Sequence, residues 1–428
     1  MAFSVLLLDN VDPICADAFK QRGINADVAP KLQLDELKAK IGSYDAIVVR
    51  SATKVDADLL KHADRLQIIG RAGVGVDNID IPAATGKGVL VMNTPDGNTI
   101  STAEHTCGMI IAMARNIPKA VDRVKSGGWD RKKFMGTEVH GKKLGIVGLG
   151  KIGTEVAVRM KSFGMDIYAY DPFTTQEHAN SYGIELAELD ELLSLSDFLT
   201  VHTPLTEKTR GMISMDSAEK LKPGIRLINC ARGGILKEED LPELIDKGVV
   251  AGAALDVYTS EPPTEELYEI LKHPQIVSTP HLGASTEEAQ EKVAMQIANQ
   301  IADALENKSY KGSLNSKSIS LLTNEEVQPY VTLAEKLGRV SGQIMPKNAS
   351  DFSFEYTGLC TKYSDVLTDA ILKGILSPFI DESVNLINAR HYALERGFKL
   401  SETNKSEGKN FNDLITIKIG DSDNYKQL

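Results

Sequence analysis

The sequence predicts an α/β fold with two Rossmann-like, doubly wound parallel-sheet lobes and an additional C-terminal α/β segment. Short apolar runs alternate with helical segments from residue 3 onward, which is the pattern of parallel α/β units. A glycine-rich turn follows one of the later runs, and the composition becomes polar after residue 309. The length of 428 residues agrees with two or three domains.

The composition is that of a globular protein with an acidic surface. Hydrophobic residues make up 42% of the chain, and the formal net charge is -11 at pH 7. This charge argues against nucleic-acid or membrane partners, and no apolar segment is long enough to span a bilayer. The amino terminus has no basic region typical of a secretory signal. The four cysteines lack metal-ligand or disulfide spacing, so we expect a cytoplasmic protein without a metal site.

The first lobe is predicted from four strand-like runs between residues 3 and 97. These runs read SVLLLD, AIVV, LQIIGRAG and VLVMN, and helical segments separate them. A long helical stretch from about Ile100 to Arg115 then leads into the second lobe. Two α/β lobes therefore follow one another along the chain.

A glycine-rich turn opens the second lobe, within KLGIVGLGKIGTEVAVRM. A buried strand is predicted to end at Val147, and helical spacing begins at Gly153. Gly148 permits a tight turn, Gly150 lets a pyrophosphate approach the main chain, and Gly153 allows close packing of helix and strand. A second strand delivers Asp171, whose carboxylate can bind ribose hydroxyls and repel a 2′-phosphate. The turn therefore predicts an NAD site rather than an NADP site.

Four further runs continue the second lobe, and polar residues follow each of them. The runs read DFLTVHTP, IRLINCARGG, VAGAALDVY and QIVSTPHLG. In open parallel sheets, ligands bind beyond the carboxyl ends of the strands. We therefore expect the functional residues at these ends.

Three of these strand ends carry a family resemblance. The motifs NCARGGIL, ALDVYTSEPP and TPHLGAST, together with GLGKIG and Asp171, resemble the D-isomer-specific 2-hydroxyacid dehydrogenases over roughly residues 1 to 310. RSATKV, GRAGVGVDNID, MNTPDGNT and RKKFMGTEVHGKKLGIVGLGKIG are similar to the members that oxidise 3-phospho-D-glycerate for serine biosynthesis. The resemblance implies a phosphorylated 2-hydroxy acid as substrate and NAD as cofactor.

The resemblance also implies a domain organisation. Residues 1-97 and 286-310 would form a discontinuous substrate-binding domain, and residues 98-285 an NAD-binding Rossmann domain. A polar, Ser- and Lys-rich stretch at 309-323 is typical of a linker. Residues 311-428 include SVNLINARHYALERGFKLSE, which resembles the intervening domain of long family members. Those members continue into a serine-binding ACT domain, so we expect no inhibition by serine here.

Hydride transfer from a secondary alcohol needs a group that accepts the hydroxyl proton and a cation that holds the carboxylate. By resemblance, His281 is the acid/base group, and Glu261 orients its ring and favours the imidazolium. Arg232 offers a planar fork for the C1 carboxylate beside the reacting C2 oxygen. These three residues are the predicted catalytic set.

The family resemblance also implies residues that bind the cofactor. Asp256 would lie near the nicotinamide carboxamide, whereas simple strand-end packing remains open for Thr203 and Cys230. Position 74 is Val where relatives carry Thr, which leaves only a backbone contact there. The cofactor-binding residues implied by the resemblance are Val74, Gly148, Gly150, Lys151, Ile152, Gly153, Asp171, Thr203, Cys230, Asp256, Gly283 and Ala284.

Substrate choice depends on cations, because a 3-phosphate calls for Arg or Lys. Candidate cations occur in the first lobe and in the GGWDRKK segment, although a solvated charged turn remains an alternative for the latter. The implied substrate-binding residues are Arg50, Ser51, Arg71, Gly73, Val74, Gly75, Arg131, Arg232 and His281.

The segment from Ile117 to His140 resembles the arm with which family members reach a partner subunit. It contains Trp129 and Phe134 in a mostly polar stretch, and such aromatic side chains are typically buried by a partner. We expect at least a homodimer, with larger oligomers left open.

Two other functions remain alternatives. One is a dehydrogenase of the same family that reduces glyoxylate or hydroxypyruvate, and the candidate phosphate-binding cations argue against it. The other is an NAD-sensing corepressor that uses the same fold to bind protein partners, and the complete Arg232, Glu261 and His281 set argues against it. A formate-oxidising relative would place Gln in the role of Glu261.

Overall fold

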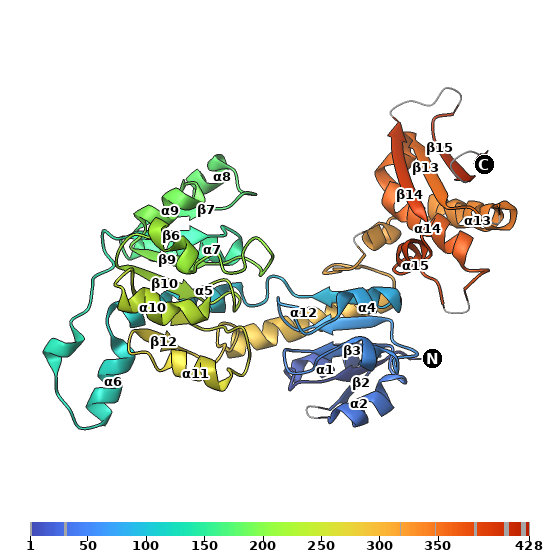
Figure 1. Ribbon diagram of the computed structural model, residues 1–428. Helices are drawn as coiled ribbons and strands as arrows, with labels where there is room; N and C mark the ends of the chain where they lie inside the picture. Colours follow the sequence, from blue (N-terminus) through green and yellow to red (C-terminus); the bar gives the residue numbers. More distant parts are fainter. Residues whose placement is uncertain are drawn as a thin grey trace. The chain divides into compact units, whose positions relative to one another are not determined.

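The computed structural model describes residues 2-29, 32-316, 318-346, 348-380, 383-405, 411-420 and 425-427. The chain divides into two compact units, Met1–Gly97 with Gln290–Leu428, and Asn98–Ala289. Figure 1 shows the order of the elements along the chain. Among the described residues, no helix is long and apolar enough to cross a membrane.

The first lobe contains a five-stranded parallel sheet. Its strands follow the order β2 (Asn25–Val28), β1 (Ser4–Leu7), β3 (Ala46–Val49), β4 (Ile68–Arg71) and β5 (Leu90–Asn93). Four of these strands are the predicted apolar runs. The edge strand β2 was missed because its sequence, NADV, is largely exposed and does not alternate.

Helices cover both faces of this sheet. On one face α1 (Ile14–Gln21) packs together with the later part of α12 (Glu287–Leu305), and on the other lie α2 (Leu34–Ile41), α3 (Ala57–Leu60) and α4 (Ile81–Gly86). The fit of α12 on β4 is close, because a Cβ atom at Gly70 would lie 2.4 Å from the Cδ1 of Ile301. Residues from both ends of the predicted discontinuous domain therefore share one core.

The second unit contains a seven-stranded parallel sheet. Its strands follow the order β12 (Ile276–Ser278), β11 (Val250–Leu255), β10 (Ile225–Asn229), β9 (Phe198–Val201), β6 (Lys143–Val147), β7 (Asp166–Tyr170) and β8 (Glu185–Leu186). The strand order reverses between β6 and β9, where doubly wound sheets bind their ligands. The predicted parallel α/β lobes are thus confirmed.

Helices cover both faces of the second sheet as well. One core lies under α5 (Thr99–Ala114), α7 (Lys151–Ser162) and α8 (Gln176–Ser181). The other lies under α9 (Leu189–Leu195), α10 (Leu241–Asp246) and α11 (Glu265–Leu271). Since all seven strands are parallel, the residues that follow β6, β7, β9, β10, β11 and β12 come out at one edge.

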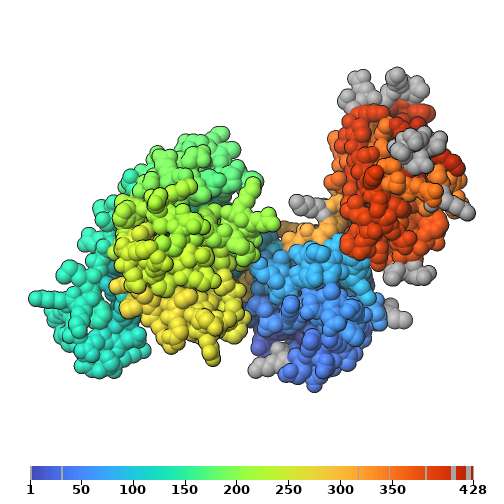
Figure 2. Space-filling view, viewed as in Figure 1, coloured from blue at the N-terminus to red at the C-terminus, as the bar shows by residue number. Residues whose placement is uncertain are grey.

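The arm predicted from the sequence begins with α6 (Ile117–Lys125) and continues through a short 3-10 helix, η1 (Arg131–Phe134). The space-filling view shows this segment, in teal, projecting from the rest of its unit (Figure 2). Trp129 is 73% exposed and Met135 is 80% exposed. The arm therefore carries large apolar side chains on its surface.

The C-terminal segment contains a mixed sheet in the order β14 (Lys399–Lys405), β13 (Asp351–Thr357), β15 (Leu414–Gly420) and β16 (Tyr425–Gln427). The helices α13 (Gln328–Ile344), α14 (Ser364–Leu376) and α15 (Ala389–Glu395) accompany it, and their apolar residues share one core with β13 and β15.

The stretch predicted to be a linker is partly bound to the first lobe. The Leu314 N–H donates to the Val91 carbonyl at 2.9 Å, and the Asn93 N–H donates to the Gly312 carbonyl at 3.1 Å. The Asn315 side chain accepts from the Val91 N–H at 2.9 Å. The polar composition hid this pairing, because backbone groups at a sheet edge need no apolar side chains to bond.

Candidate active site

The three glycines of the β6–α7 turn have three different surroundings. Gly148 has φ +94, and a Cβ atom there would lie 2.7 Å from the His202 carbonyl oxygen. A Cβ atom at Gly153 would lie 2.2 Å from the Gly148 carbonyl oxygen, so the helix could not approach the strand. A Cβ atom at Gly150 would contact nothing within 4 Å. Gly150 therefore leaves open backbone, as a bound pyrophosphate requires.

The helix after this turn begins earlier than its side-chain spacing suggests. The prediction that Gly153 opens the helix was wrong by two residues, since α7 begins at Lys151 with the extended Gly150 as its N-cap. Lys151 is exposed and Ile152 half-buried in the first turn of α7. The N–H groups of this first turn form the partly positive end of the helix dipole, where a phosphate binds favourably.

Asp171 follows β7 and holds the glycine turn. Its Oδ2 accepts from the Leu149 N–H at 2.8 Å, and its Oδ1 accepts from the Phe173 N–H at 2.8 Å. Each carboxylate oxygen retains a further lone pair with which to accept a ribose hydroxyl. The carboxylate thus fixes the turn, and its contact with the ribose of NAD stays a prediction.

Thr203 and Cys230 follow the next two strands of the sheet after β6, which are β9 and β10. The Thr203 hydroxyl, after β9, is buried and makes no hydrogen bond within the protein. A buried hydroxyl without a partner is costly, so it suits a contact with a bound ligand. Cys230, after β10, is buried, and burial raises the pKa of its thiol to about 12. Cys230 therefore acts as a small apolar side chain rather than a nucleophile.

His281 and Glu261 form a hydrogen-bonded pair at the ends of two adjacent strands, β12 and β11. Nδ1 of His281 lies 2.6 Å from Oε2 of Glu261, whose Oε1 accepts from the Tyr258 N–H at 3.1 Å. The hydrogen bond with Glu261 raises the pKa of His281 against the opposing effect of burial. Because Nδ1–H faces the carboxylate, Nε2 is the nitrogen left to exchange a proton.

His281 also has an uncommon backbone conformation, with φ +55. Strained backbone conformations of residues other than glycine cluster at active sites and ligand-binding sites.

Arg232 extends from the loop after β10. Its carbonyl accepts from Nδ2 of Asn229 at 2.8 Å, and its Nη1 donates to the Ala231 carbonyl at 2.7 Å. The positive charge of Arg232 acts against the rise in the pKa of His281. The parallel sheet therefore brings the predicted catalytic residues Arg232, Glu261 and His281 to one edge.

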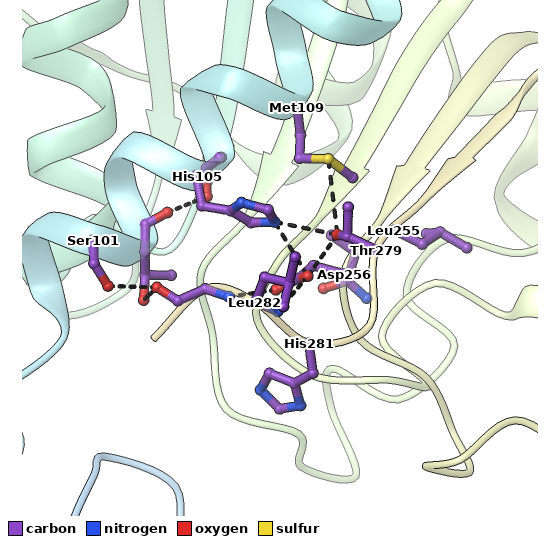
Figure 3. Close-up of polar contacts among 12 residues, drawn as sticks. Ser101, His105, Met109, Leu255, Asp256, Thr279, His281 and Leu282 are labelled. Atoms are coloured by element: carbon purple, nitrogen blue, oxygen red, sulfur yellow. Dashed lines mark hydrogen bonds and ion pairs between the residues drawn. The ribbon is translucent and has the colours of Figure 1, made fainter. Parts of the chain in front are cut away.

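Asp256 closes β11 and is fully buried. Its carboxylate accepts from the Leu282 N–H at 2.7 Å, the Gly283 N–H at 2.9 Å and the Thr279 hydroxyl at 2.6 Å (Figure 3). The half-buried Ala284 follows in the same loop. The contact of Asp256 with the nicotinamide stays a prediction, whereas its role in shaping the 279-283 loop is visible.

His105 and Thr279 complete this network and were missed by the sequence reasoning. The ring nitrogen Nε2 of His105 lies 3.1 Å from Asp256 Oδ1 and 3.2 Å from the Thr279 hydroxyl oxygen. A single histidine in a helix carries no local signal of such a role. The only hint in the sequence was that Ser101, His105 and Met109 recur at four-residue spacing on one face of the expected helix.

The predicted substrate residues of the first lobe also follow strand ends. Arg50 and Ser51 come after β3, where the Arg50 N–H donates to Oδ2 of Asp9 at 2.8 Å. Arg71 ends β4, and a Cβ atom at Gly73 would lie 1.8 Å from its Nη1, so the glycine makes room for the guanidinium.

Val74 and Gly75 continue this turn, and the Val74 carbonyl accepts from Nδ2 of Asn93 at 2.7 Å. Arg131 lies on the arm, with its guanidinium 5.6 Å from the centre of the Trp129 ring. Within the described part of the chain, no group of three or more His, Cys, Asp or Glu side chains could hold a metal ion.

Comparisons with known proteins found two matching family models and several similar sequences. The model of the D-isomer specific 2-hydroxyacid dehydrogenase NAD-binding domain matches residues 107–283, and that of the D-3-phosphoglycerate dehydrogenase intervening domain matches residues 326–428. A D-3-phosphoglycerate dehydrogenase of Archaeoglobus fulgidus is 42% identical, with 96% of this chain and 78% of the relative covered. The enzyme of that name from Bacillus subtilis is 44% identical, with 89% and 72% covered.

A solved structure provides a further comparison. The D-lactate dehydrogenase of Aquifex aeolicus, complexed with NAD and lactic acid, superposes with a TM-score of 0.62 at 27% sequence identity. The match covers 71% of this chain and 96% of that one.

Proposed function

Since this chain belongs to the D-3-phosphoglycerate dehydrogenases of the D-isomer specific 2-hydroxyacid dehydrogenase family, we propose that His281, Glu261 and Arg232 carry its reaction. The reaction is the NAD-dependent oxidation of 3-phospho-D-glycerate to 3-phosphohydroxypyruvate, the first step of phosphorylated L-serine biosynthesis. The observation that supports these roles best is the 2.6 Å contact between His281 and Glu261 at the edge that carries the glycine turn.

His281 accepts the proton of the substrate C2 hydroxyl at Nε2, while Nδ1–H stays bonded to Glu261. NAD, held at the glycine turn, would supply the acceptor for the hydride that leaves the same carbon. The imidazolium that forms is stabilised by the Glu261 carboxylate, which lowers the free energy of the charged state. In the reverse direction the same Nε2 returns the proton.

Arg232 holds the C1 carboxylate through two parallel N–H groups and so presents C2 in a fixed orientation. We assign the distal phosphate to Arg50 and Arg71, and to Arg131 donated by a neighbouring subunit. These cations would make the enzyme select 3-phosphoglycerate over unphosphorylated 2-hydroxy acids.

The substrate is tested by following NADH formation with 3-phosphoglycerate, D-lactate, D-glycerate and D-2-hydroxyglutarate under the same conditions. The proposal expects the highest kcat/KM with 3-phosphoglycerate. A higher value with D-glycerate, or faster reduction of glyoxylate than of 3-phosphohydroxypyruvate, would favour the alternative member of the family.

Replacing Glu261 by Gln is expected to shift the pH-rate profile to lower pH. The carboxylate raises the pKa of His281, so its neutral replacement lowers that pKa. Oxidation needs neutral His281 and rises with pH through this pKa, whereas reduction needs the imidazolium and falls through it. Both limbs should therefore move in the same direction. Measurement of kcat/KM from pH 5 to 10 tests this pair, and a profile that stays in place would argue against it.

Replacing Asp171 by Ala is expected to weaken NAD binding and narrow its advantage over NADP. The variant loses acceptors for the ribose hydroxyls and the charge that repels a 2′-phosphate, which corresponds to about 1–3 kcal/mol for NAD. Fluorescence titration with NADH and NADPH measures both effects. Asp166→Ala, at the other end of β7, is a matched control, and an unchanged NADH to NADPH ratio in Asp171→Ala would exclude the ribose contact.

We further propose that the chain forms at least a homodimer through its arm and works in the cytoplasm. The exposed Trp129 and Met135 support the first statement. The four cysteines, all free and buried, support the second, since a reducing compartment preserves thiols.

A further inference from the structure

One face of α5 holds the loop from which His281 extends. Ser101, His105 and Met109 recur at four-residue spacing along the helix (Figure 3), and Thr102 follows Ser101 in the chain. The carbonyl of Gly283 accepts from the Ser101 hydroxyl at 2.5 Å and from the Thr102 hydroxyl at 3.1 Å. At the other end of the loop, His105 reaches Thr279. The helix thus fixes both ends of the segment 279-283.

The proton positions around His105 follow from its two partners. The Thr279 hydroxyl donates its single proton to Oδ1 of Asp256 at 2.6 Å, so its oxygen can only accept from His105. The Asp256 carboxylate also accepts. Nε2 of His105 therefore carries the proton and shares it between Asp256 and Thr279.

The Asp256 carboxylate depends on the N–H group of His105 because its side chain is buried away from water. Its side chain is 0% exposed, and burial alone would raise its pKa. Hydrogen bonds from His105, Thr279 and Leu282 outweigh burial and hold the pKa of Asp256 below its ordinary value. Without His105, an ionised carboxylate would remain buried with one donor fewer, and the backbone of Leu282 and Gly283 would have to move to satisfy it.

His281 lies between the two anchored ends of this loop, and its ring is turned away from His105 in Figure 3. A shift of the Leu282 backbone would therefore displace the adjacent His281 without any contact between the two rings.

We propose that His105 is a positioning residue for the dehydrogenase reaction, acting through Asp256 and Thr279 on the loop that aims His281. It exchanges no proton with substrate. This inference rests on the proposed role of His281 and adds a residue to which neither the sequence motifs nor the family resemblance assigned a function.

The test compares His105→Leu with His105→Gln. Leu removes the N–H donor, and kcat for 3-phosphoglycerate should fall by about tenfold to 100-fold, the loss expected for a misplaced catalytic group. Since His105→Leu replaces none of the residues predicted to bind NAD or substrate, KM should change less than kcat, by under about threefold. Gln places an N–H near the position of Nε2 and should restore most of kcat, although its amide does not titrate as an imidazole does. The midpoint of the pH-rate profile should stay at the wild-type value in both variants.

His178 is an exposed histidine on α8, and His178→Gln is therefore the matched control, which should behave as wild type. Thermal unfolding and NADH titration show whether each variant is folded. If His105→Leu does not fold, Thr279→Val removes the other anchor and should give the same loss of kcat, with Thr279→Ser retaining activity. Wild-type kcat in His105→Leu, no rescue by Gln, or a shifted pH midpoint would overturn the inference. Retained activity in His281→Ala would instead contradict the proposed function.

Discussion

His281→Ala is expected to lower kcat for 3-phosphoglycerate oxidation by about 10²–10⁴-fold, the range associated with loss of a general base. Nε2 of His281 is the proton acceptor of the proposed mechanism, and water in its place would be neither oriented nor matched in pKa. Stopped-flow measurement of NADH formation under saturating substrate gives kcat directly. The dependence on pH attributed to His281 should disappear along with the rate.

NADH binding distinguishes a loss of kcat that is due to the missing imidazole from one that is due to misfolding of the variant. The glycine turn and Asp171 are not altered, so the dissociation constant for NADH should stay close to the wild-type value. His178→Ala serves as the matched histidine control. A loss of less than about tenfold would show that another group accepts the proton.

Arg232→Lys is expected to reduce kcat/KM by about 100-fold or more for every 2-hydroxy acid that the enzyme uses. Lys keeps the charge but cannot offer two parallel N–H groups to the C1 carboxylate, so C2 loses its orientation. Because all substrates carry this carboxylate, the loss should be similar for 3-phosphoglycerate and for D-lactate, which has no anionic group at its far end. Steady-state kinetics with both substrates measures it.

Arg50→Ala provides the contrast, since the distal phosphate is present in only one of those substrates. Its effect should be confined to 3-phosphoglycerate, and the same holds for Arg131→Ala if the arm completes a neighbouring site. Equal losses on both substrates in Arg131→Ala would place that residue outside the phosphate site. A selective loss in Arg232→Lys would contradict its carboxylate role.

Much of the fold could be predicted because apolar runs mark buried strands and because glycines mark places where the backbone has no room for a side chain. β4 and β6 are apolar and buried, and Gly148 and Gly153 stand where the backbone leaves no room for a side chain. The family, the parallel sheets and the NAD-binding lobe were predicted correctly from such signals. β2 and the 312-315 pairing were missed, because hydrogen bonding at a sheet edge depends on the backbone and leaves little trace in the side chains.

The residues of the active site could likewise be predicted only in part. Glu261 and His281 could be named from motifs at strand ends, but their 2.6 Å contact depends on the pairing of β11 with β12. His105 could not be named at all, because its partners are contributed by segments more than one hundred and fifty residues later in the chain. Long-range polar networks of this kind are specified by the packed fold rather than by any local pattern.

The shared core of β4 and α12 has a consequence for synthesis. Ile297 and Ile301 complete the core of the first lobe, yet the ribosome adds them about two hundred residues after Gly70, a delay on the order of 10–40 s at ordinary elongation rates. The contiguous unit Asn98–Ala289 has no such dependence on later residues. The nascent chain therefore completes its second lobe first, while the first lobe carries an open apolar face that chaperones can bind.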